Sequence, residues 1–205
     1  TILFFGTLVS CILLANTTLS LEPAFREGFF QVVAFITTIG FVSADYLQWP
    51  SAGMIILFLL FFAGASTGST TGSIKMVRHL LVLKNIRSSF TRLIHPSMVT
   101  QIRVNNKPIT EQNNLSATSF LIIYIFIFLA GTMTFAVSGL DPLTAASAAA
   151  SSLGNVGPGF GSIGPVFNYL HLPVISKLIS SLLMIIGRLE IYTFFILFTR
   201  SFWKI

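Results

Sequence analysis

Long apolar runs alternate with shorter, punctuated apolar segments along the whole chain. The long runs are residues 1–19, 117–137 and 174–199, and the shorter ones are residues 24–36, 51–62 and 141–153. A helix of roughly 20 apolar residues can cross a bilayer, so the long runs predict membrane spans. An acidic residue followed by proline, which is typical of a helix start, opens two short segments at Glu22-Pro23 and Asp141-Pro142. Glu22 and Asp141 are candidate helix caps near an outer mouth.

The order of these segments repeats once. Each half contains a long run, an acidic residue before proline, a short helix, a glycine-containing loop, another proline and a last span. Gly64 follows Pro50 by 14 residues, and Gly187 follows Pro173 by the same interval. This regularity indicates two tandem units of about 100 residues. The predicted divisions are residues 1–78 for the first unit, 79–116 for a basic loop, and 117–205 for the second unit.

Composition restricts the class of protein. Of the 205 residues, 54% are hydrophobic and only 9% are charged, whereas a soluble domain carries roughly a quarter charged residues. This excludes a soluble enzyme, a disordered chain and a collagen-like fibre. Cys11 is the single cysteine, which excludes an internal disulfide and a cysteine zinc cluster. Basic cytoplasmic loops explain the net charge of +6 better than nucleic-acid binding, so we expect no nucleic-acid partner.

The distribution of basic residues predicts how the short segments meet the membrane. Seven of the 12 Lys and Arg residues lie between Lys75 and Lys107, and Arg200 and Lys204 lie in the C-terminal tail. Because basic loops prefer the cytoplasm, an even number of crossings should separate these stretches. Counting residues 141–153 as a crossing would make three. The helix predicted for residues 141–153 is also too short to span the membrane. We therefore expect the chain to enter the membrane with this helix and to return to the same face.

A re-entrant helix is followed by a loop that returns through membrane depth without helical hydrogen bonds. Such a loop is tolerated where its carbonyls line protein or a water-filled path, as in potassium-channel filters. Residues 37–41 and 154–159 follow the two short helices and are the candidates for such loops, and their glycines allow left-handed backbone angles.

Residues 51–62 cover only about 18 Å as a helix, which is less than the thickness of the membrane. Part of the polar stretch 64–73 should therefore also lie within the membrane, and alternation over residues 99–109 predicts a small β-hairpin beyond it.

Five stretches, taken together and in order, resemble the Trk/Ktr/HKT superfamily of potassium transporters, and most closely its TrkH-type membrane subunits. Residues 34–41 and 153–159 look like the third and fourth filters, 64–75 like an intramembrane gating loop, 95–108 like a cytoplasmic hairpin and 187–190 like part of the last helix. The superfamily has four repeats around one pore. The resemblance therefore implies an all-α membrane protein with two tandem span–pore helix–filter loop–span repeats, which form half of a four-repeat pore.

The resemblance also implies a function, partners and site residues. It implies potassium transport by a multi-pass subunit of a bacterial inner membrane, with potassium as substrate, no bound cofactor and no enzyme chemistry. The implied partners are membrane lipid, the remaining N-terminal repeats, a cytosolic nucleotide-binding regulatory subunit and a second full-length chain. The filter carbonyls would belong to Thr37, Thr38, Ile39, Gly40, Gly154, Asn155, Val156 and Gly157. The implied gate comprises Gly64, Gly68, Ser69, Thr70, Thr71, Gly72, Lys75 and Arg188.

Arg188 and Glu190 are ionisable residues inside an apolar run, which makes them functional candidates. Residues two apart do not share a helix face, so we expect no ion pair between them. The resemblance places Arg188 below the filter, facing the pore. We expect Glu190 to pair with a neighbouring basic group. Lys75 has a second interpretation, as an anchor of its span at the inner surface.

Three other functions remain open at this stage. A secondary transporter with re-entrant hairpins for another small cation would place substrate-specific polar or charged groups at the helix breaks. An intramembrane enzyme would need a nucleophile, a carboxylate or a metal set at depth, and Arg188 and Glu190 do not make one. A non-conducting assembly subunit would not need two glycine-centred loops.

Overall fold

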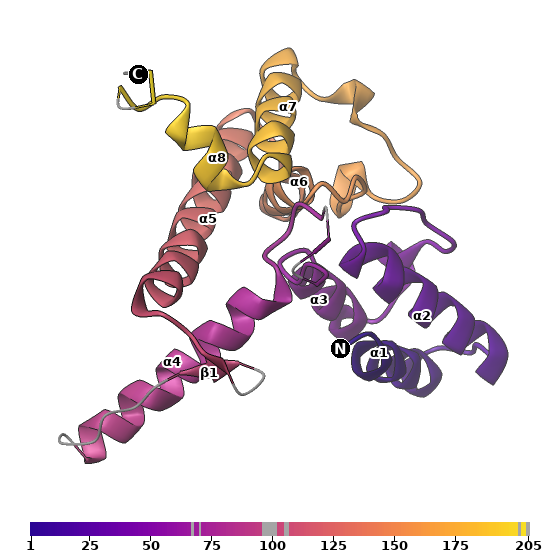
Figure 1. Ribbon diagram of the computed structural model, residues 1–205. Helices are drawn as coiled ribbons and strands as arrows, with labels where there is room; N and C mark the ends of the chain where they lie inside the picture. Colours follow the sequence, from indigo (N-terminus) through magenta and orange to yellow (C-terminus); the bar gives the residue numbers. More distant parts are fainter. Residues whose placement is uncertain (67, 70, 96–101, 105–106, 201, 204–205) are drawn as a thin grey trace.

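The computed structural model of the chain is an array of helices joined by connections of very different lengths (Figure 1). It describes residues 1–66, 68–69, 71–95, 102–104, 107–200 and 202–203. The helices are α1 (Ile2–Asn16), α2 (Leu21–Ile36), α3 (Ser51–Leu60), α4 (Met76–Ile94), α5 (Glu111–Val137), α6 (Pro142–Gly154), α7 (Val174–Arg188) and α8 (Ile191–Ile196). Short 3₁₀ helices are η1 (Tyr46–Gln48), η2 (Gly161–Ile163) and η3 (Tyr169–His171), and the strands are β1 (Arg103–Val104) and β2 (Lys107–Pro108).

The two predicted units are packed against each other through a shared core. In the first unit, α1 packs along α2, and in the second unit α6 packs between α5 and α7. Phe35, Tyr46 and Phe61 form the centre of one buried cluster, and Phe160 from the second unit joins them. The ring of Phe160 lies 5.3 Å from that of Tyr46 and 6.0 Å from that of Phe61, measured between centroids. The long loops that follow the short helices thus contribute Tyr46 and Phe160 to the core of the structure.

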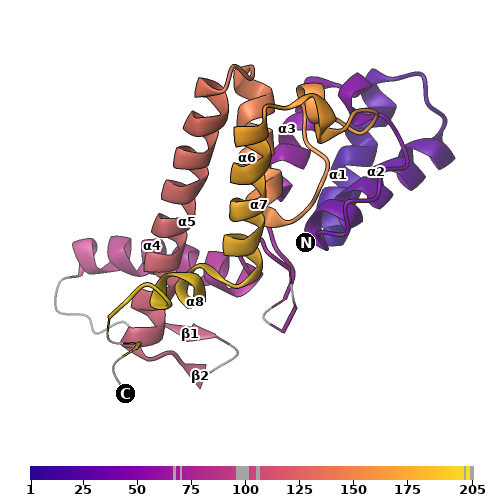
Figure 2. The same cartoon turned by 90° about the horizontal axis from the view of Figure 1, so that it is seen from above.

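The second unit follows the path expected for a re-entrant segment. Figure 2 shows α6 running back beside α5, after which the chain returns towards the start of α6 before α7 begins. The start of α6 is well defined because Asp141 caps it, its carboxylate accepting the Thr144 N–H at 3.1 Å. Pro142 occupies the first turn, where a missing N–H is harmless. The predicted cap and proline start are confirmed here.

The corresponding start in the first unit differs from the expectation. Ser20, not Glu22, is the N-cap residue of α2, and its side chain makes no capping hydrogen bond. The helix begins two residues before Pro23, so Glu22 lies in its first turn. There its carboxylate pairs with Arg26 at 2.9 Å, one turn along the helix, and it also lies near the positive end of the helix dipole.

The last apolar run is not one continuous helix, contrary to the expectation for residues 174–199. It divides into α7 and α8 at Glu190, which has φ 61° and ψ 135°. A residue with this backbone cannot continue an α-helix. The Glu190 carboxylate instead contacts basic side chains from the start of α4, and these contacts favour the break.

The stretch expected as a basic loop contains a long helix. α4, which is 19 residues long, begins before this stretch and occupies its positions 79–94, and α5 begins at Glu111 rather than near residue 117. α4 crosses the direction of α5 at a steep angle (Figure 2). The predicted hairpin is present, because Val104 pairs with Lys107 and Arg103 with Pro108 in antiparallel register. Its turn residues, 105 and 106, lie outside the described residues.

The helices of the first and last apolar runs are shorter than those runs suggest, whereas α5 is longer than its run. Within the described residues, α5 is the helix long and apolar enough to cross a membrane unaided, with a mean hydropathy of 2.4 over its best window. α1 and α3 are shorter apolar helices. Many apolar side chains on α5 are exposed in this chain, including Ile122, Phe126 and Met133, as expected of a surface that contacts lipid or further helices.

Candidate functional site

The loops after α2 and α6, residues 37–41 (the first loop) and 154–159 (the second loop), share a backbone conformation although their sequences differ. In the first loop, Thr38 has φ 53° and Gly40 has φ 75°. In the second, Asn155 has φ 56° and Gly157 has φ 111°. Each loop thus alternates a left-handed residue, an ordinary residue and a left-handed glycine. Equivalent conformations at equivalent positions confirm that the repeat in the sequence is a repeat in structure.

Equivalent hydrogen bonds hold both loops to their helices. The Ile39 N–H donates to the Ala34 carbonyl at 3.1 Å, and the Val156 N–H donates to the Ser151 carbonyl at 3.0 Å. The second loop has one extra restraint, because the Ser151 hydroxyl accepts the Gly157 N–H at 3.0 Å. Ala34, at the corresponding position, has no hydroxyl to offer.

Thr38 is strained in a way that Asn155 is not. A β-branched residue at positive φ is a genuine outlier, whereas Asn is one of the residues that adopt the left-handed region most readily. Strain of this kind costs about 1–3 kcal/mol and is typically found at functional sites. The positive φ of Thr38 therefore makes the first loop a candidate functional segment.

The two loops touch each other directly at one glycine. A Cβ atom added to Gly40 would collide with the carbonyl oxygen of Val156 and would lie 3.1 Å from Cδ of Pro158. The same atom added to Gly157 would meet nothing within 4 Å. Gly40 is therefore closed in by the second loop, while Gly157 faces open space in this chain.

The other predicted filter residues lie on the two loops or at the helix ends before them. Thr37 is the C-cap of α2, and its hydroxyl donates to the Val33 carbonyl at 2.7 Å. Gly154 is the buried last residue of α6. Ile39 is exposed in this chain, whereas Val156 is buried. The structure thus brings the predicted filter residues into two adjoining loops.

Two tyrosines that the sequence analysis did not select hold the second loop in place. The Tyr46 hydroxyl donates to the Gly159 carbonyl at 2.6 Å, and the Tyr169 hydroxyl donates to the Gly157 carbonyl at 2.8 Å. A buried tyrosine hydroxyl normally has a hydrogen-bond partner. The presence of a tyrosine after each loop is therefore the sequence signal from which these two contacts could have been suspected. Tyr46 belongs to the first unit, which makes its bond a link between the repeats.

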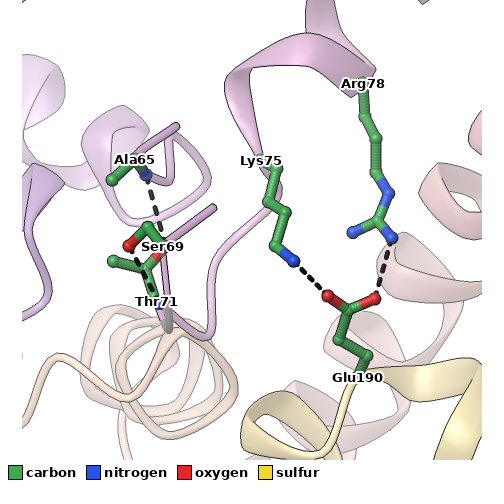
Figure 3. A network of polar contacts seen from close by, with 6 residues as sticks. All are labelled: Ala65, Ser69, Thr71, Lys75, Arg78 and Glu190. Carbon is green, nitrogen blue, oxygen red and sulfur yellow. Dashed lines mark hydrogen bonds and ion pairs between the residues drawn. The ribbon is translucent and has the colours of Figure 1, made fainter. Parts of the chain in front are cut away.

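The described part of the predicted gating loop, residues 64–66, 68–69 and 71–73, folds back on itself. The Gly64 N–H donates to the Ile74 carbonyl at 2.9 Å, which joins the two ends of the segment. The Ala65 N–H donates to the Thr71 hydroxyl at 3.4 Å, and the Thr71 N–H donates to the Ser69 hydroxyl at 3.2 Å (Figure 3). The segment is therefore internally bonded.

Further contacts fix this segment against both units. The Ser73 hydroxyl donates to the Phe61 carbonyl at 2.8 Å, which satisfies one of the free carbonyls at the end of α3. Gly72 lies against Gly154 of the second unit, since its Cβ would be 2.9 Å from the Gly154 carbonyl oxygen. Gly68 has open space around it. Thr70, another predicted gate residue, lies outside the described residues.

Glu190 pairs with basic residues from the first unit, as expected. Its carboxylate contacts the ammonium of Lys75 and, at 3.0 Å, the Arg78 guanidinium (Figure 3). Arg78 also lies over the ring of Phe120 with its Cζ 3.6 Å from the centroid, a cation–π contact. Lys75 is thus attached to the break between α7 and α8. Arg188 is the last residue of α7 and is exposed in this chain. Its pore-facing role stays a prediction.

Titratable side chains offer no site for a bound metal cofactor in the described part of the chain. There, no three His, Cys, Asp or Glu residues gather closely enough to hold a metal ion. The oxygen atoms that the two loops offer belong to backbone carbonyls, threonine hydroxyls and the Asn155 amide. Such oxygen ligands suit a bare alkali cation.

Comparison with known proteins identifies the family. Residues 12–205 match the TrkH family model, described as "Cation transport protein". The chain is 35% identical over 179 residues to the Trk system potassium uptake protein TrkH of Halomonas elongata, and 32% identical to that of Escherichia coli K12. These alignments cover 87% of this chain but 37% of each relative. The chain therefore spans well under half of the length of these relatives.

A solved structure agrees with this result. The crystal structure of the potassium transporter TrkH from Vibrio parahaemolyticus is 30% identical and superimposes with a TM-score of 0.90. The match covers 99% of this chain and 43% of that one. The fold predicted from the sequence, half of a larger helical membrane transporter, is confirmed. The chain belongs to the TrkH family of cation transport proteins.

Proposed function

We propose that this chain supplies two of the four repeats that surround a potassium-conducting pore in a Trk-type uptake system. The proposal rests mainly on the two contacting loops, which share positive φ angles at Thr38 and Gly40 and at Asn155 and Gly157. Two quasi-equivalent loops are what a pore with repeated symmetry needs from half of its wall. Family membership and the potassium transport named in its relatives support potassium as the substrate.

Selectivity arises from carbonyl oxygens of the two loops, which replace the hydration shell of the ion together with loops from the missing repeats. Buried aromatic rings and the hydroxyls of Tyr46 and Tyr169 restrain the second loop. Asp141 supplies negative charge at the outer end of α6. Hydrogen bonds from the Thr144 side chain and N–H hold the pKa of this carboxyl below its usual range, so it stays ionised and attracts cations.

The gate consists of residues 64–73 with Lys75 and Arg188. A fixed positive charge in a poorly screened region repels a permeating cation. Glu190 neutralises Lys75 and ties the end of the gate to α7 and α8. Deletion within residues 64–73 and the change Arg188→Ala should each raise potassium flux.

The remaining features follow from placing this pore in a bacterial inner membrane. The N-terminal repeats of the same protein complete the ring, and full-length chains form a homodimer. The basic side that carries α4 and the β-hairpin faces the cytosol. It offers a docking face for a nucleotide-binding regulatory subunit.

The test uses the full-length protein reconstituted in liposomes, with potassium and sodium flux measured separately. Gly157→Ser adds a side chain where there is space but where φ is 111°, so it alters the backbone alone. Strain of about 1–3 kcal/mol, expressed fully as a change in relative ion binding, corresponds to a roughly fivefold or greater loss of potassium-over-sodium discrimination. Gly139→Ser is the matched control, because Gly139 has φ 91°, equally open surroundings and a position outside both loops.

The two variants separate a filter from an ordinary turn. Loss of discrimination in Gly157→Ser, with Gly139→Ser unchanged, supports the proposal. Wild-type discrimination in a folded, inserted Gly157→Ser protein contradicts it, and so does equal loss in both variants.

A further inference from the structure

The side chain of Asn155 lies where three segments meet. Its Nδ2 donates a hydrogen bond to the carbonyl of Met184 in α7 at 3.1 Å. A Cβ atom on Gly72 would lie 2.6 Å from the same nitrogen, and one on Gly187 would lie 2.9 Å from it. The amide thus occupies a narrow space between segment 64–73 on one side and α7 on the other.

Neighbouring contacts make this junction tight. A Cβ on Gly154 would lie 2.9 Å from the Ser73 hydroxyl oxygen and 3.2 Å from the Phe61 carbonyl oxygen. A Cβ on Gly187 would collide with the Leu153 carbonyl oxygen. Three glycines, Gly72, Gly154 and Gly187, therefore allow segment 64–73, the end of α6 and α7 to approach within backbone contact.

We propose that Asn155 is a positioning residue that couples segment 64–73 to the second loop. This rests on the proposed function of these two parts as gate and filter. Asn155 belongs to the loop through its left-handed backbone, at φ 56° and ψ 40°, and touches the gate through its side chain. When segment 64–73 moves away, the Asn155 amide loses its contact with Gly72, which confines it against the Met184 carbonyl. The backbone at residues 154–157 then relaxes, so gate position and ion selectivity change together.

The coupling belongs to the second loop in particular. At the equivalent position the first loop has Thr38, whose side chain carries no amide and is too short to make the same bridge. Of the two loops, the second therefore places an amide between Gly72 of segment 64–73 and the Met184 carbonyl of α7.

The test combines a selectivity readout with a gate readout in the full-length protein in liposomes. Ser66→Cys, placed in a Cys11→Ala background, reports the accessibility of the segment to a water-soluble thiol reagent, because Ser66 is exposed. Asn155→Gly keeps the left-handed backbone and removes the amide. It should lower potassium-over-sodium discrimination and raise the rate of thiol labelling at position 66, each by at least about threefold, as coupling between contacting residues predicts. Gly53→Ala is the control and should change neither, since its Cβ meets Trp49 at an ordinary 3.8 Å.

The reverse experiment starts from the gate. Gly72→Ala places a methyl group against Nδ2 of Asn155 and should alter ion discrimination in the filter. In an Asn155→Gly background the same methyl should have a smaller effect on discrimination, because the amide it displaces is gone. If Gly72→Ala does not insert, Asn155→Asp gives the comparison instead. It keeps the shape but cannot donate to Met184, and it should lower discrimination as Asn155→Gly does.

The outcomes distinguish the coupling from the function on which it rests. A wild-type protein without potassium preference contradicts the proposed function itself. A selective wild-type protein in which Asn155→Gly changes neither discrimination nor labelling overturns the coupling alone. Fully additive effects of Gly72→Ala and Asn155→Gly overturn it as well.

Discussion

The two units have matching loops but different second helices, and the contrast shows where the fold allows freedom. Thr38 and Asn155 have φ angles of 53° and 56°, even though one is β-branched and the other is an amide. After the loops the units diverge. α3 ends at Leu60, whereas α7 continues through Gly187, the residue that corresponds to Gly64 in the first unit. Loop geometry is thus shared by the repeats, and helix continuity is not.

Local chemistry explains the divergence. Residues 61–75 of the first unit are rich in glycine and hydroxyl residues, which provide internal hydrogen bonds that compete with a helix. The Ser73 hydroxyl donates a hydrogen bond to the Phe61 carbonyl, so fewer backbone carbonyls lack a partner where the helix ends. In α7 the corresponding residues are apolar up to Gly187, and the helix continues. The repeat that breaks early thus supplies the segment proposed as the gate, and the one that continues keeps its helix as far as Arg188.

The largest expected difference between the loops concerns Gly40 and Gly157. Gly40→Ala combines backbone strain with a collision against the Val156 carbonyl, whereas Gly157→Ala adds strain alone. Strain costs about 1–3 kcal/mol and overpacking adds about 1–3 kcal/mol more. Gly40→Ala should therefore lower the melting temperature of the full-length protein in detergent clearly more than Gly157→Ala. Equal shifts would mean that the loops do not meet at Gly40.

The sequence predicted the repeated parts of the structure well, because their signals are local. Asp141-Pro142 marked the start of α6, and the short apolar run at residues 51–62 correctly predicted a broken helix. α4 was missed because its basic residues were interpreted as a loop, although Leu83, Ile86 and Phe90 follow helical spacing. The polar, charged composition hid an amphipathic pattern.

The parts that could not be predicted depend on contacts between distant residues. Gly187 weakens the helix three positions before Glu190 but does not fix where it ends, and the residues that stabilise the break, Lys75 and Arg78, lie more than 100 positions earlier. The bridge from Asn155 to Met184 and the bond from Tyr46 to Gly159 are likewise tertiary. A glycine loop can be located from sequence, but the groups that hold it are known only from the fold.

A second difference between the units concerns their ion pairs. Glu190, whose side chain is 39% accessible, joins Lys75 and Arg78, whose side chains are 16% and 19% accessible, whereas the side chains of Glu22 and Arg26 are 70% and 66% accessible. Hydrogen bonds to charged groups contribute about 1.5–3 kcal/mol when protected, and exposed pairs contribute about 0–1 kcal/mol. Glu190→Gln should therefore lower the melting temperature, and Glu22→Gln should leave it nearly unchanged.

Salt dependence provides a check on this assignment. Exposed pairs are screened by salt, while protected pairs are screened much less. The destabilisation in Glu190→Gln should persist at high ionic strength. If high salt abolishes it, the pair does not hold α4 to the break between α7 and α8.

The first left-handed residue of each loop should respond to glycine with opposite signs. Thr38→Gly relieves a β-branched residue at positive φ and should stabilise the protein by about 1 kcal/mol, after the added flexibility of glycine is subtracted. Asn155→Gly relieves little strain and removes the hydrogen bond to Met184, so it should destabilise by about 1 kcal/mol. Thermal unfolding of the full-length variants measures both. A destabilised Thr38→Gly protein would show that the threonine side chain contributes more than its strain costs.

The smallest expected difference lies at the starts of the two short helices. Asp141 caps α6 through the Thr144 N–H, whereas Ser20 makes no side-chain cap on α2. Asp141→Ala should cost about 1 kcal/mol, and Ser20→Ala less than about 0.5 kcal/mol. Hydrogen bonds from Thr144 lower the pKa of Asp141 in the folded protein. The ionised cap therefore stabilises the folded state fully above the usual carboxyl pKa of about 4. This stabilisation is lost as the pH falls through the lowered pKa of the folded state. The gap in melting temperature between wild type and Asp141→Ala should therefore narrow between about pH 7 and about pH 3, while the small effect of Ser20→Ala stays constant. A gap that is equally wide at both pH values would assign the effect of Asp141 to packing rather than to its ionised cap.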